Sequence, residues 1–460
     1  MQEGPFINLS RLFRDGEQTV LRVNELRNRR VVLLNGELIQ NQRSGSRGVS
    51  ALVSRNGSRG FASMGSVGAD DAERVLRCAA ENALFLSRHA PRELPPLPVC
   101  PKRRIDARRE IIDTPQHTLI DAVRALDAFV AGLPGLVSRR VAYYEDSQEK
   151  WIYTSDACDG HVTIPRCYFY VEMNAEAKDG STVSIMQAYG GLGSFTEQFA
   201  DLTWMYEDIR IQHGWLMDKR DGVYAEAGLK TVVMGGDLTG MLAHEAVGHT
   251  TEADLVLGGS VAGPNLNKTV ASPLISLVDY AHTVSGREAP LPLLLDDEGI
   301  PAEDAWLIRD GILVGYMNNR ESAARFGVIP AGNARAWDYS DEPLVRMRNT
   351  AILPGRDKLS DMIASLDDGY YLLVTGNGQA DATGEFMFGI NMGYEVKNGK
   401  LGRAILDTTV SGVAFEMLKT VDMVSDELVW TSNGFCGKKQ PMPVGCGGPA
   451  LRCRMTIGGR

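Results

Sequence analysis

The sequence lacks the features of a membrane or secreted protein. It contains no apolar run of about 18 residues, so no membrane-spanning helix is expected. Residues Met1–Asn8 show no basic segment followed by an apolar core, so no secretory signal is expected there. The 7 cysteines, an odd number spread widely, do not form the pattern of a disulfide framework. These absences together predict a protein of the reducing cytoplasm without a membrane partner.

The sequence is also poor in clustered basic charge and in aromatic residues. It contains 48 Lys and Arg residues and 58 Asp and Glu residues, which gives a formal net charge of −10. Nucleic-acid-binding surfaces, in contrast, usually carry clustered Lys and Arg. Short basic runs such as Arg27–Arg30 and Lys102–Arg104 are typical of solvated faces. We therefore expect no nucleic-acid partner. Aromatic residues make up 7%, while 49 of the 460 residues are glycine, which predicts many turns and short strands.

Turn and periodicity signals predict an α+β fold that begins with hairpins and a helix. Asn35-Gly36 and Asn56-Gly57 each follow an apolar run, and each pair supplies the positive backbone φ that a two-residue hairpin turn needs. Residues 70–86 then place six apolar side chains at helical spacing. They are Ala72, Val75, Leu76, Ala79, Ala83 and Leu86. The proline-rich residues 91–101 cannot continue this helix and form the candidate linker.

A helix and an antiparallel sheet are predicted for the rest of residues 1–220. Thr114-Pro115 predicts a helix cap followed by proline in the first turn. Alternating apolar patterns then predict four strands, at residues 140–144, 151–153, 168–173 and 182–187, and Asp179-Gly180 is the hairpin turn between the last two. With a further helix at residues 202–219, this region is predicted to be an antiparallel sheet with helices on one side.

Residues 221–460 are predicted to form a β-rich C-terminal domain. The apolar run Thr231–Met234 leads to Asp237, a candidate cap for a helix at residues 238–249. Short β-like runs separated by Gly, Asp and Asn turns follow at residues 291–295, 307–313, 370–375, 385–388 and 394–396. The predicted texture is all-β with one buried helix, and that helix contains two histidines.

The segment from His244 to His249 carries the sharpest chemical signal. Zinc binds neutral imidazole well, and Glu245, beside the first histidine, is suited to deprotonating a metal-bound water. The familiar zincin pattern places its histidines four residues apart on one helical face, whereas these two are five apart. In a regular helix that spacing separates them by roughly 140°. The helix must therefore bulge or unwind, and Gly248 is the residue that would permit it.

A third ligand is needed, because two histidines rarely hold zinc firmly. Glu252 lies three residues past His249, with Asp254 close behind it. Cys436 lies in a glycine-flanked loop that could bring a thiolate to the metal at about 2.3 Å. The residues by themselves leave these alternatives open. A lone histidine is usually a satisfied core or surface residue, but two of only 7 in one apolar helix beside an acid favour metal binding.

Motifs along nearly the whole chain resemble one known family. The segment His244–His249, followed by Glu252-Ala253-Asp254, resembles the HExxxH signature of the TldD half of the TldD/TldE (PmbA) zinc metallopeptidase family. Other stretches are similar to motifs of the same family. They are Gly48–Val53 with Gly60–Ser63, Asp296–Gly299, Gly332–Arg335, Arg346–Thr350, Gly384–Phe386, Cys436–Lys438 and Gly447–Pro449. The combination is far more specific than any one of these motifs.

The resemblance implies a cofactor, a set of site residues and a partner. Zinc would be held by His244, His249 and Cys436, with Glu245 as the general base, and Glu252 would become a supporting residue. The family implies a cytoplasmic peptidase for unfolded peptides, including leader peptides. Such a chain is expected to pair with a TldE/PmbA-like paralogue in a heterodimer, or with a copy of itself.

On this interpretation the metal activates a water molecule, Glu245 takes its proton, and the peptide lies extended beside an exposed strand edge. Two alternatives are a non-catalytic subunit that only presents peptides and a scaffold protein with a structural zinc site. Retention of both histidines and the glutamate argues against the first. A structural site closes four protein ligands, so an open coordination position would argue against the second.

Overall fold

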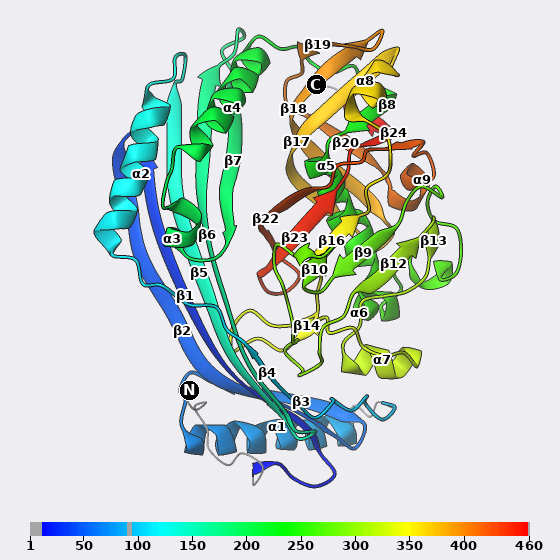
Figure 1. Ribbon diagram of the computed structural model, residues 1–460. Helices are drawn as coiled ribbons and strands as arrows, with labels where there is room; N and C mark the ends of the chain where they lie inside the picture. The colour runs from blue at the N-terminus through cyan, green and yellow to red at the C-terminus, as the bar shows by residue number, and fades with distance from the viewer. Residues whose placement is uncertain (1–11, 90–93, 459–460) are drawn as a thin grey trace.

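The computed structural model describes residues 12–89 and 94–458, which form two parts with separate β-sheets (Figure 1). The long curved strands of the first part lie along one side of the molecule, and the β-rich second part lies against them. The α+β fold is confirmed. The predicted absence of a signal in Met1–Asn8 and the start of the linker at residues 91–93 lie outside the described residues. The predicted boundary between residues 220 and 221 stays a prediction.

The first sheet has the strand order β3-β2-β1-β5-β6-β4, and β7 also pairs with β6. Its strands are β1 (Gln18–Leu34), β2 (Glu37–Arg55), β3 (Ser58–Met64), β4 (Arg103–Ala107), β5 (Ser138–Thr154), β6 (Cys158–Glu176) and β7 (Thr182–Leu192). All pairs are antiparallel except β4 with β6. The segments 140–144 and 151–153, predicted as separate strands, belong to β5. The polar residues between them are buried, apart from the half-buried Glu145 and Glu149, and they keep their pairing with β1 and β6.

The Asn-Gly turns form as the sequence predicts. Asn35 and Gly36 have φ values of 51° and 87°, and Asn56 and Gly57 have φ values of 49° and 72°. Positive φ at both central positions is the geometry whose twist matches that of the paired strands. These turns join β1 to β2 and β2 to β3. Asp179-Gly180 lies in the longer connection between β6 and β7, where only Gly180, at 81°, has a positive φ.

The helices of the first part lie on one face of the sheet, and the second part covers the other face (Figure 1). These helices are α1 (Ala69–His89), α2 (Gln116–Ala131), α3 (Phe195–Phe199) and α4 (Trp204–Arg220). In β1, the odd-numbered Leu21 and Val23 join the core beneath α1, whereas Val20 packs with Leu295 of the second part. This alternation follows from the two-residue period of a strand. The sheet is therefore covered on both faces at this end of β1, whereas most of β2 before Val49 is exposed.

Three details differ from the predictions for this part. The buried face of α1 ends at Ala83, and Leu86 is exposed. Pro115 rather than Thr114 occupies the N-cap of α2, and no side chain caps that helix. The described part of the predicted linker, residues 94–101, packs against the protein: Cys100 is buried and its backbone N–H bonds to Asp156.

In the second part, five strands close into a ring in the order β17-β8-β24-β20-β18, because β18 also pairs with β17. A second sheet has the order β13-β12-β9-β16-β23-β22. The long strands are β8 (Gly228–Met234), β17 (Asp368–Ala380), β18 (Glu385–Lys397), β20 (Thr408–Val413), β22 (Val429–Cys436), β23 (Met442–Gly448) and β24 (Leu451–Ile457). The shorter strands are β9 (Leu277–Tyr280), β10 (Thr283–Val284), β11 (Arg287–Glu288), β12 (Ala305–Arg309), β13 (Ile312–Leu313), β14 (Ala334–Arg335), β15 (Leu344–Val345), β16 (Asn349–Ile352), β19 (Lys400–Ala404) and β21 (Met423–Val424).

The strands and helices of the second part also differ in several places from those that the sequence predicts. Residues 291–295 form no strand, because Pro290 and Pro292 cannot donate to a ladder, and only Leu295 makes an isolated bridge. The two predicted strands within 385–396 are one strand, β18. Short helices occur besides the predicted one. They are α6 (Ala253–Leu257), α7 (Arg320–Phe326), α8 (Leu359–Ala364) and α9 (Ala414–Leu418), whereas α5 (Gly236–Leu242) is the start of the helix predicted at residues 238–249.

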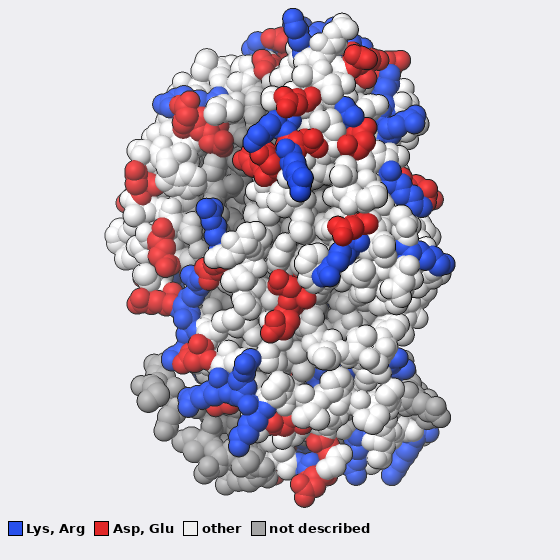
Figure 2. Space-filling view, turned by 45° about the vertical axis from the view of Figure 1, so that its right-hand side comes forward, with Lys and Arg blue, Asp and Glu red and all other residues white. Residues whose placement is uncertain are grey.

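The surface carries charges of both signs. On the face drawn in Figure 2, Lys and Arg side chains are interspersed with Asp and Glu side chains. Such mixing differs from the clustered basic surface that is typical of nucleic-acid binding. None of the helices in residues 12–89 and 94–458 combines the length and the apolar character that a membrane span requires.

A buried ion-pair cluster joins the two parts. Asp296 accepts hydrogen bonds from the backbone N–H groups of Glu298 and Ile300 at 2.9 Å each, so its side chain stabilises this turn. Asp297 instead accepts a hydrogen bond from Nζ of Lys150 at 2.8 Å and lies 3.3 Å from a guanidinium nitrogen of Arg22. Lys150 and Arg22 belong to the first sheet. Burial lowers the pKa of Lys150 to about 8, although the charge of Asp297 opposes the shift.

Replacing Asp297 by Asn is expected to lower the free energy of unfolding by about 3 kcal/mol, because Lys150 and Arg22 would stay buried without their counter-charge. Chemical denaturation followed by circular dichroism measures the change. Asp106→Asn, which removes one carboxylate from an exposed pair with Arg108, is the control and should leave the midpoint unchanged. Equal stability of Asp297→Asn and wild type would contradict the role of this cluster.

Candidate metal centre

The helix after β8 changes its hydrogen-bonding pattern at the predicted metal-binding residues. α5 is followed by a π-helical turn at Ala243–Gly248 and by a 3-10 turn at His249–Thr251. A π-helical turn holds one residue more than an α-helical turn, so residues five apart approach the same side of the helix. The ring centroids of His244 and His249 lie 5.0 Å apart. The bulge that the five-residue spacing requires is therefore present.

Gly248 permits this bulge through its size. Its φ of −54° and ψ of −56° are ordinary helical values that any residue adopts. A Cβ at this position would lie 2.1 Å from Sδ of Met347, which is fully buried. The helix therefore approaches Met347 at a distance that only glycine allows. The sequence pointed to the right residue, but the physical reason is close packing and not backbone freedom.

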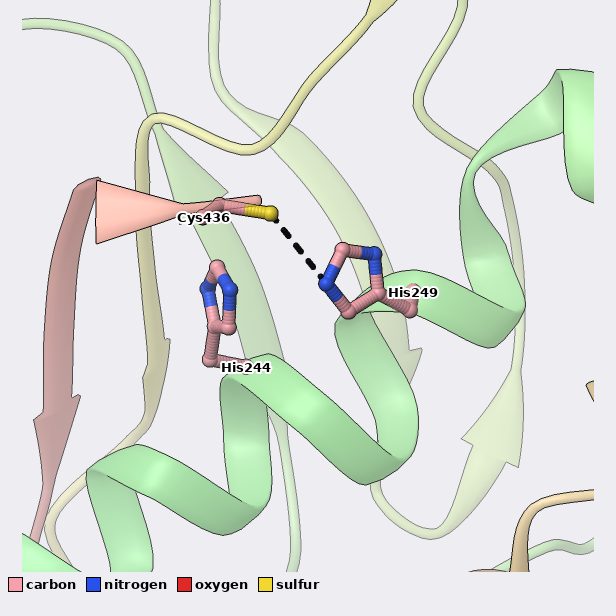
Figure 3. A group of neighbouring side chains, drawn as sticks. All are labelled: His244, His249 and Cys436. Carbon is pink, nitrogen blue, oxygen red and sulfur yellow. Dashed lines mark hydrogen bonds between the residues drawn. The ribbon is translucent and has the colours of Figure 1, made fainter. Parts of the chain in front are cut away.

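Cys436, at the end of β22, completes a cluster of three donor side chains (Figure 3). Its Sγ lies 3.2 Å from Nε2 of His249, and candidate donor atoms of His244, His249 and Cys436 all lie within 4.8 Å of one another. Among the described residues, no fourth His, Cys, Asp or Glu joins this group. Two imidazole nitrogens and a thiolate are donors that zinc accepts, at about 2.0–2.1 Å and 2.3 Å respectively, so the cluster fits that ion.

The carboxylate of Glu245 lies beside both imidazoles. Its two oxygens are 4.0 Å from Nε2 of His244 and 3.7 Å from Nε2 of His249. Its side chain is 22% exposed, compared with 3% for His244, so the glutamate lies on the more open side of the cluster. A carboxylate in this position can exchange a proton with a water molecule at the cluster.

Glu252 and Asp254, the other candidate ligands, support the cluster from outside. Glu252 Oε2 bonds to Nδ1 of His249 at 2.7 Å, which leaves Nε2 of that ring directed at Cys436. Nζ of Lys438 lies 3.2 Å from the same carboxylate oxygen and donates to both oxygens of Asp254, at 3.0 and 2.9 Å. Contacts of this kind fix the orientation and tautomer of a metal-binding histidine.

Arg346 is a buried residue to which the sequence gave no role. Its guanidinium donates to the carbonyl oxygens of Cys436 at 2.7 Å, Lys438 at 2.8 Å and Gln440 at 2.9 Å. One side chain therefore holds three carbonyls of the loop that carries the cysteine. Met347, the next residue, packs on the histidine helix. The sequence showed this stretch only as a family motif, because its acceptors lie far along the chain.

The charge balance of the cluster favours a thiolate. Burial raises the pKa of the Cys436 thiol, but hydrogen bonds with His244 and His249 and their charge outweigh burial and lower the pKa to about 4. Burial lowers the pKa of His249, whereas its hydrogen bonds with Cys436 and Glu252 raise it to about 9. Without a metal, the cluster therefore holds a thiolate beside protonated imidazole at neutral pH. Metal binding must displace that imidazole proton.

A cleft of about 430 Å³ lies beside the cluster, between β6 and β7 of the first sheet and α5, β17 and β22 of the second part. Cys446 lines the cleft and lies against His244, whose pKa it helps to raise against the opposing effect of burial. β22 is the terminal strand of its sheet, so within residues 12–89 and 94–458 one of its edges has no strand partner. Hydroxyls of Tyr168 and Tyr170 bond to the carbonyls of Ser432 and Asn433 in that strand.

Comparisons with known proteins agree with this fold and site. Residues 227–459 match the PmbA/TldA metallopeptidase C-terminal domain, and residues 109–232 match the PmbA/TldA metallopeptidase central domain. The chain belongs to the PmbA/TldD metallopeptidase family.

Individual relatives carry related names. A metalloprotease TldD homologue of Haemophilus influenzae is 39% identical over 242 residues, 52% of this chain and 50% of that protein. A metalloprotease of Methanothermobacter thermautotrophicus is 32% identical over 342 residues, 72% of this chain and 71% of that protein. A zinc metalloprotease TldD homologue of Saccharolobus solfataricus is 28% identical over 331 residues, 71% of this chain and 72% of that protein. The match spans about half the length of the Haemophilus protein and of two Buchnera homologues.

Two solved structures share the fold. TldE from Thermococcus kodakarensis has a TM-score of 0.74 at 18% identity, covering 98% of this chain and 99% of that chain. A Thermotoga maritima protein described as a candidate modulator of a DNA gyrase has a TM-score of 0.76 at 18% identity, covering 97% and 98%.

Replacing Gly248 by Ala is expected to lower zinc affinity about tenfold or more, because the added Cβ overlaps Met347 and displaces His249. Equilibrium dialysis with metal analysis measures the affinity. The double variant Gly248→Ala/Met347→Ala should regain part of the zinc affinity, because the smaller side chain at position 347 leaves room for the added Cβ. Gly214→Ala, at a helical glycine with open space around its Cβ position, is the control. Failure of Met347→Ala to restore binding would contradict the packing explanation.

The low pKa of Cys436 predicts a thiolate over an unusually wide pH range in the metal-free protein. The ultraviolet thiolate absorbance that Cys436→Ala removes should stay constant on acidification and fall only near pH 4. Cys453→Ala is the control, because burial raises the pKa of that thiol to about 12 and it should contribute nothing at neutral pH. A thiolate signal that develops only above the ordinary cysteine pKa of about 8.5 would show that the histidines do not stabilise the thiolate.

Proposed function

We propose that the protein is a cytoplasmic zinc metallopeptidase of the TldD type that hydrolyses unfolded peptides or leader peptides. The observation that carries the proposal is the meeting of His244, His249 and Cys436 beside the carboxylate of Glu245. The first three are assigned as zinc ligands and Glu245 as the general base. Membership of a metallopeptidase family supports the assignment.

The side chains divide the work of peptide hydrolysis. When bound, zinc would polarise the scissile carbonyl and lower the pKa of a water molecule toward about 7. Glu245 takes the proton of the attacking water and later returns it to the leaving amine. Glu252 holds His249 through Nδ1, and Arg346 holds the loop of Cys436. These two supporting residues keep the donor atoms in place without contacting the substrate.

The cleft along β22 is the proposed binding place of the peptide. An edge strand without a strand partner can bind an extended chain through main-chain hydrogen bonds, with little preference for side chains. The cleft passes Cys446, next to His244, so a chain lying there approaches the cluster. This arrangement suits unfolded peptides, which offer an extended backbone.

A structural zinc site and a peptide-presenting subunit are the alternative functions. A structural site normally closes four protein ligands and needs no carboxylate beside them, whereas three donors and Glu245 occur together in the described part of the chain. A presenting subunit has no need of this set. A TldE/PmbA-like paralogue is the proposed partner in a heterodimer, with a homodimer as the second choice. The shared fold with a TldE structure supports the pairing.

Glu245→Gln is expected to keep zinc and to lose cleavage of an unstructured peptide by about a hundredfold or more, because the general base is removed. Cys436→Ala is expected to lose zinc. Metal analysis and peptide mass spectrometry measure both effects, with and without a co-expressed paralogue. Cys453→Ala, a buried cysteine away from the cluster, is the control and should keep metal and cleavage. Full cleavage by Glu245→Gln would refute the mechanism and favour a structural or presenting role.

A further inference from the structure

Asp237 is an acidic residue of the cleft without a cationic partner. It lies in the first turn of α5, where Gly235 rather than Asp237 occupies the N-cap. Its carboxylate accepts one hydrogen bond, from the backbone N–H of Thr375 at 3.0 Å. Among the described residues, no Lys, Arg or His pairs with it, and burial raises the pKa of the carboxyl group. A carboxylate that is desolvated and unpaired in a cleft favours a positively charged ligand.

Asp237 and the metal cluster lie along the same face of one helix. His244 follows Asp237 by seven residues, which is about two helical turns, so the two side chains project to the same side. Met241 lies between them on that face and also lines the cleft. With a rise of about 1.5 Å per residue, the two positions are roughly 10 Å apart along the axis. The cleft therefore extends from the carboxylate of Asp237 to Cys446, which lies against His244 of the cluster.

The walls of the cleft combine apolar side chains, such as Val374 and Trp430, with uncharged polar groups that suit a peptide backbone. Amide and hydroxyl side chains of the cleft come from both parts of the molecule. They are Gln187, Thr375, Asn377, Asn391, Thr431, Ser432 and Asn433. Such groups donate and accept hydrogen bonds without carrying charge. Apart from Asp237, the residues that line this cleft carry no charged side chain, so the carboxylate is its dominant electrostatic feature.

We propose that Asp237 binds a primary ammonium group of the peptide substrate and thereby sets the position of the bond that is cleaved. This inference rests on the proposed peptidase function. An extended peptide advances about 3.3 Å per residue, so roughly 10 Å corresponds to three residues. If the ammonium group is the α-amino group of the chain, the enzyme removes fragments of about three residues from the N-terminus. A lysine side chain is the other source of the same chemical group.

Binding to the zinc-loaded Glu245→Gln protein separates these sources without hydrolysis. Three fluorescent, unstructured peptides are compared: one with a free N-terminus and no lysine, one acetylated without lysine, and one acetylated with one lysine. Preference for the first over the second, by about tenfold in Kd, identifies the α-amino group. Equal binding of the first and third, both tighter than the second, identifies any primary ammonium. Equal binding of all three overturns the proposal.

Asp237→Asn is the decisive variant, because the amide keeps the size of the side chain and an acceptor for the Thr375 N–H. It should abolish the preference while zinc content stays unchanged. Asp368→Asn, which removes the same charge at the far, exposed end of β17, should keep the preference. A preference for the free amine that survives in Asp237→Asn overturns the assignment of this residue.

Cleavage by wild type then tests the spacing. Mass spectrometry should find the first cut of the free-amine peptide about three residues from its N-terminus, and Asp237→Asn should scatter the cuts along the chain. Identical cut sites in both proteins would overturn the inference. Cleavage without any preference for an ammonium group removes the role of Asp237 only. Ammonium-dependent binding without cleavage of any peptide would instead contradict the proposed peptidase function, while the assignment of Asp237 as the ammonium-binding residue would stand.

Discussion

The contact between Gly248 and Met347 sets the geometry on which the candidate site depends. Because no side chain separates the helix from Met347, the backbone can bulge into a π-helical turn and bring His244 and His249 to the same side. The residue before Met347, Arg346, holds the carbonyls of the loop that carries Cys436. One short segment therefore positions the donors of both the helix and the loop. A small displacement of this segment would move all three donor side chains together.

The site is also an electrostatic balance among buried groups. A thiolate, two imidazoles and the carboxylate of Glu252 are tolerable in a buried place only because each faces an opposite charge or a hydrogen-bond donor. Lys438 completes the balance by bridging Glu252 and Asp254. The stretch Cys436–Lys438 thus supplies a candidate ligand and, two positions along, a counter-charge for Glu252 and Asp254. A divalent ion entering this cluster would take over the positive charge that protonated imidazole supplies beside the thiolate.

The cleft exists because two parts of the chain face each other across it. The first sheet contributes one wall, and the edge strand β22 with α5 contributes the other. The buried cluster of Lys150, Arg22 and Asp297 holds the two parts in register at a distance from the cleft. Within the cleft, Asp237 gives one end a negative charge. On the proposed function, the separation between that charge and the candidate metal cluster would set the distance from an ammonium group of the substrate to the bond that is cleaved.

The sequence alone determined the hairpins, the main helices and the two candidate histidines of the site. Local signals suffice for these features: Asn35-Gly36 needs no distant residue to form its turn, and the spacing of His244 and His249 already demands a bulge. The choice among Glu252, Asp254 and Cys436 depended on family resemblance until the fold brought β22 to the helix. Tertiary structure decided the rest. Three features arise from contacts between residues far apart in the chain, which no local pattern encodes. They are the close packing of Gly248 on Met347, the hydrogen bonds from Arg346 to the loop of Cys436, and the cleft at Asp237.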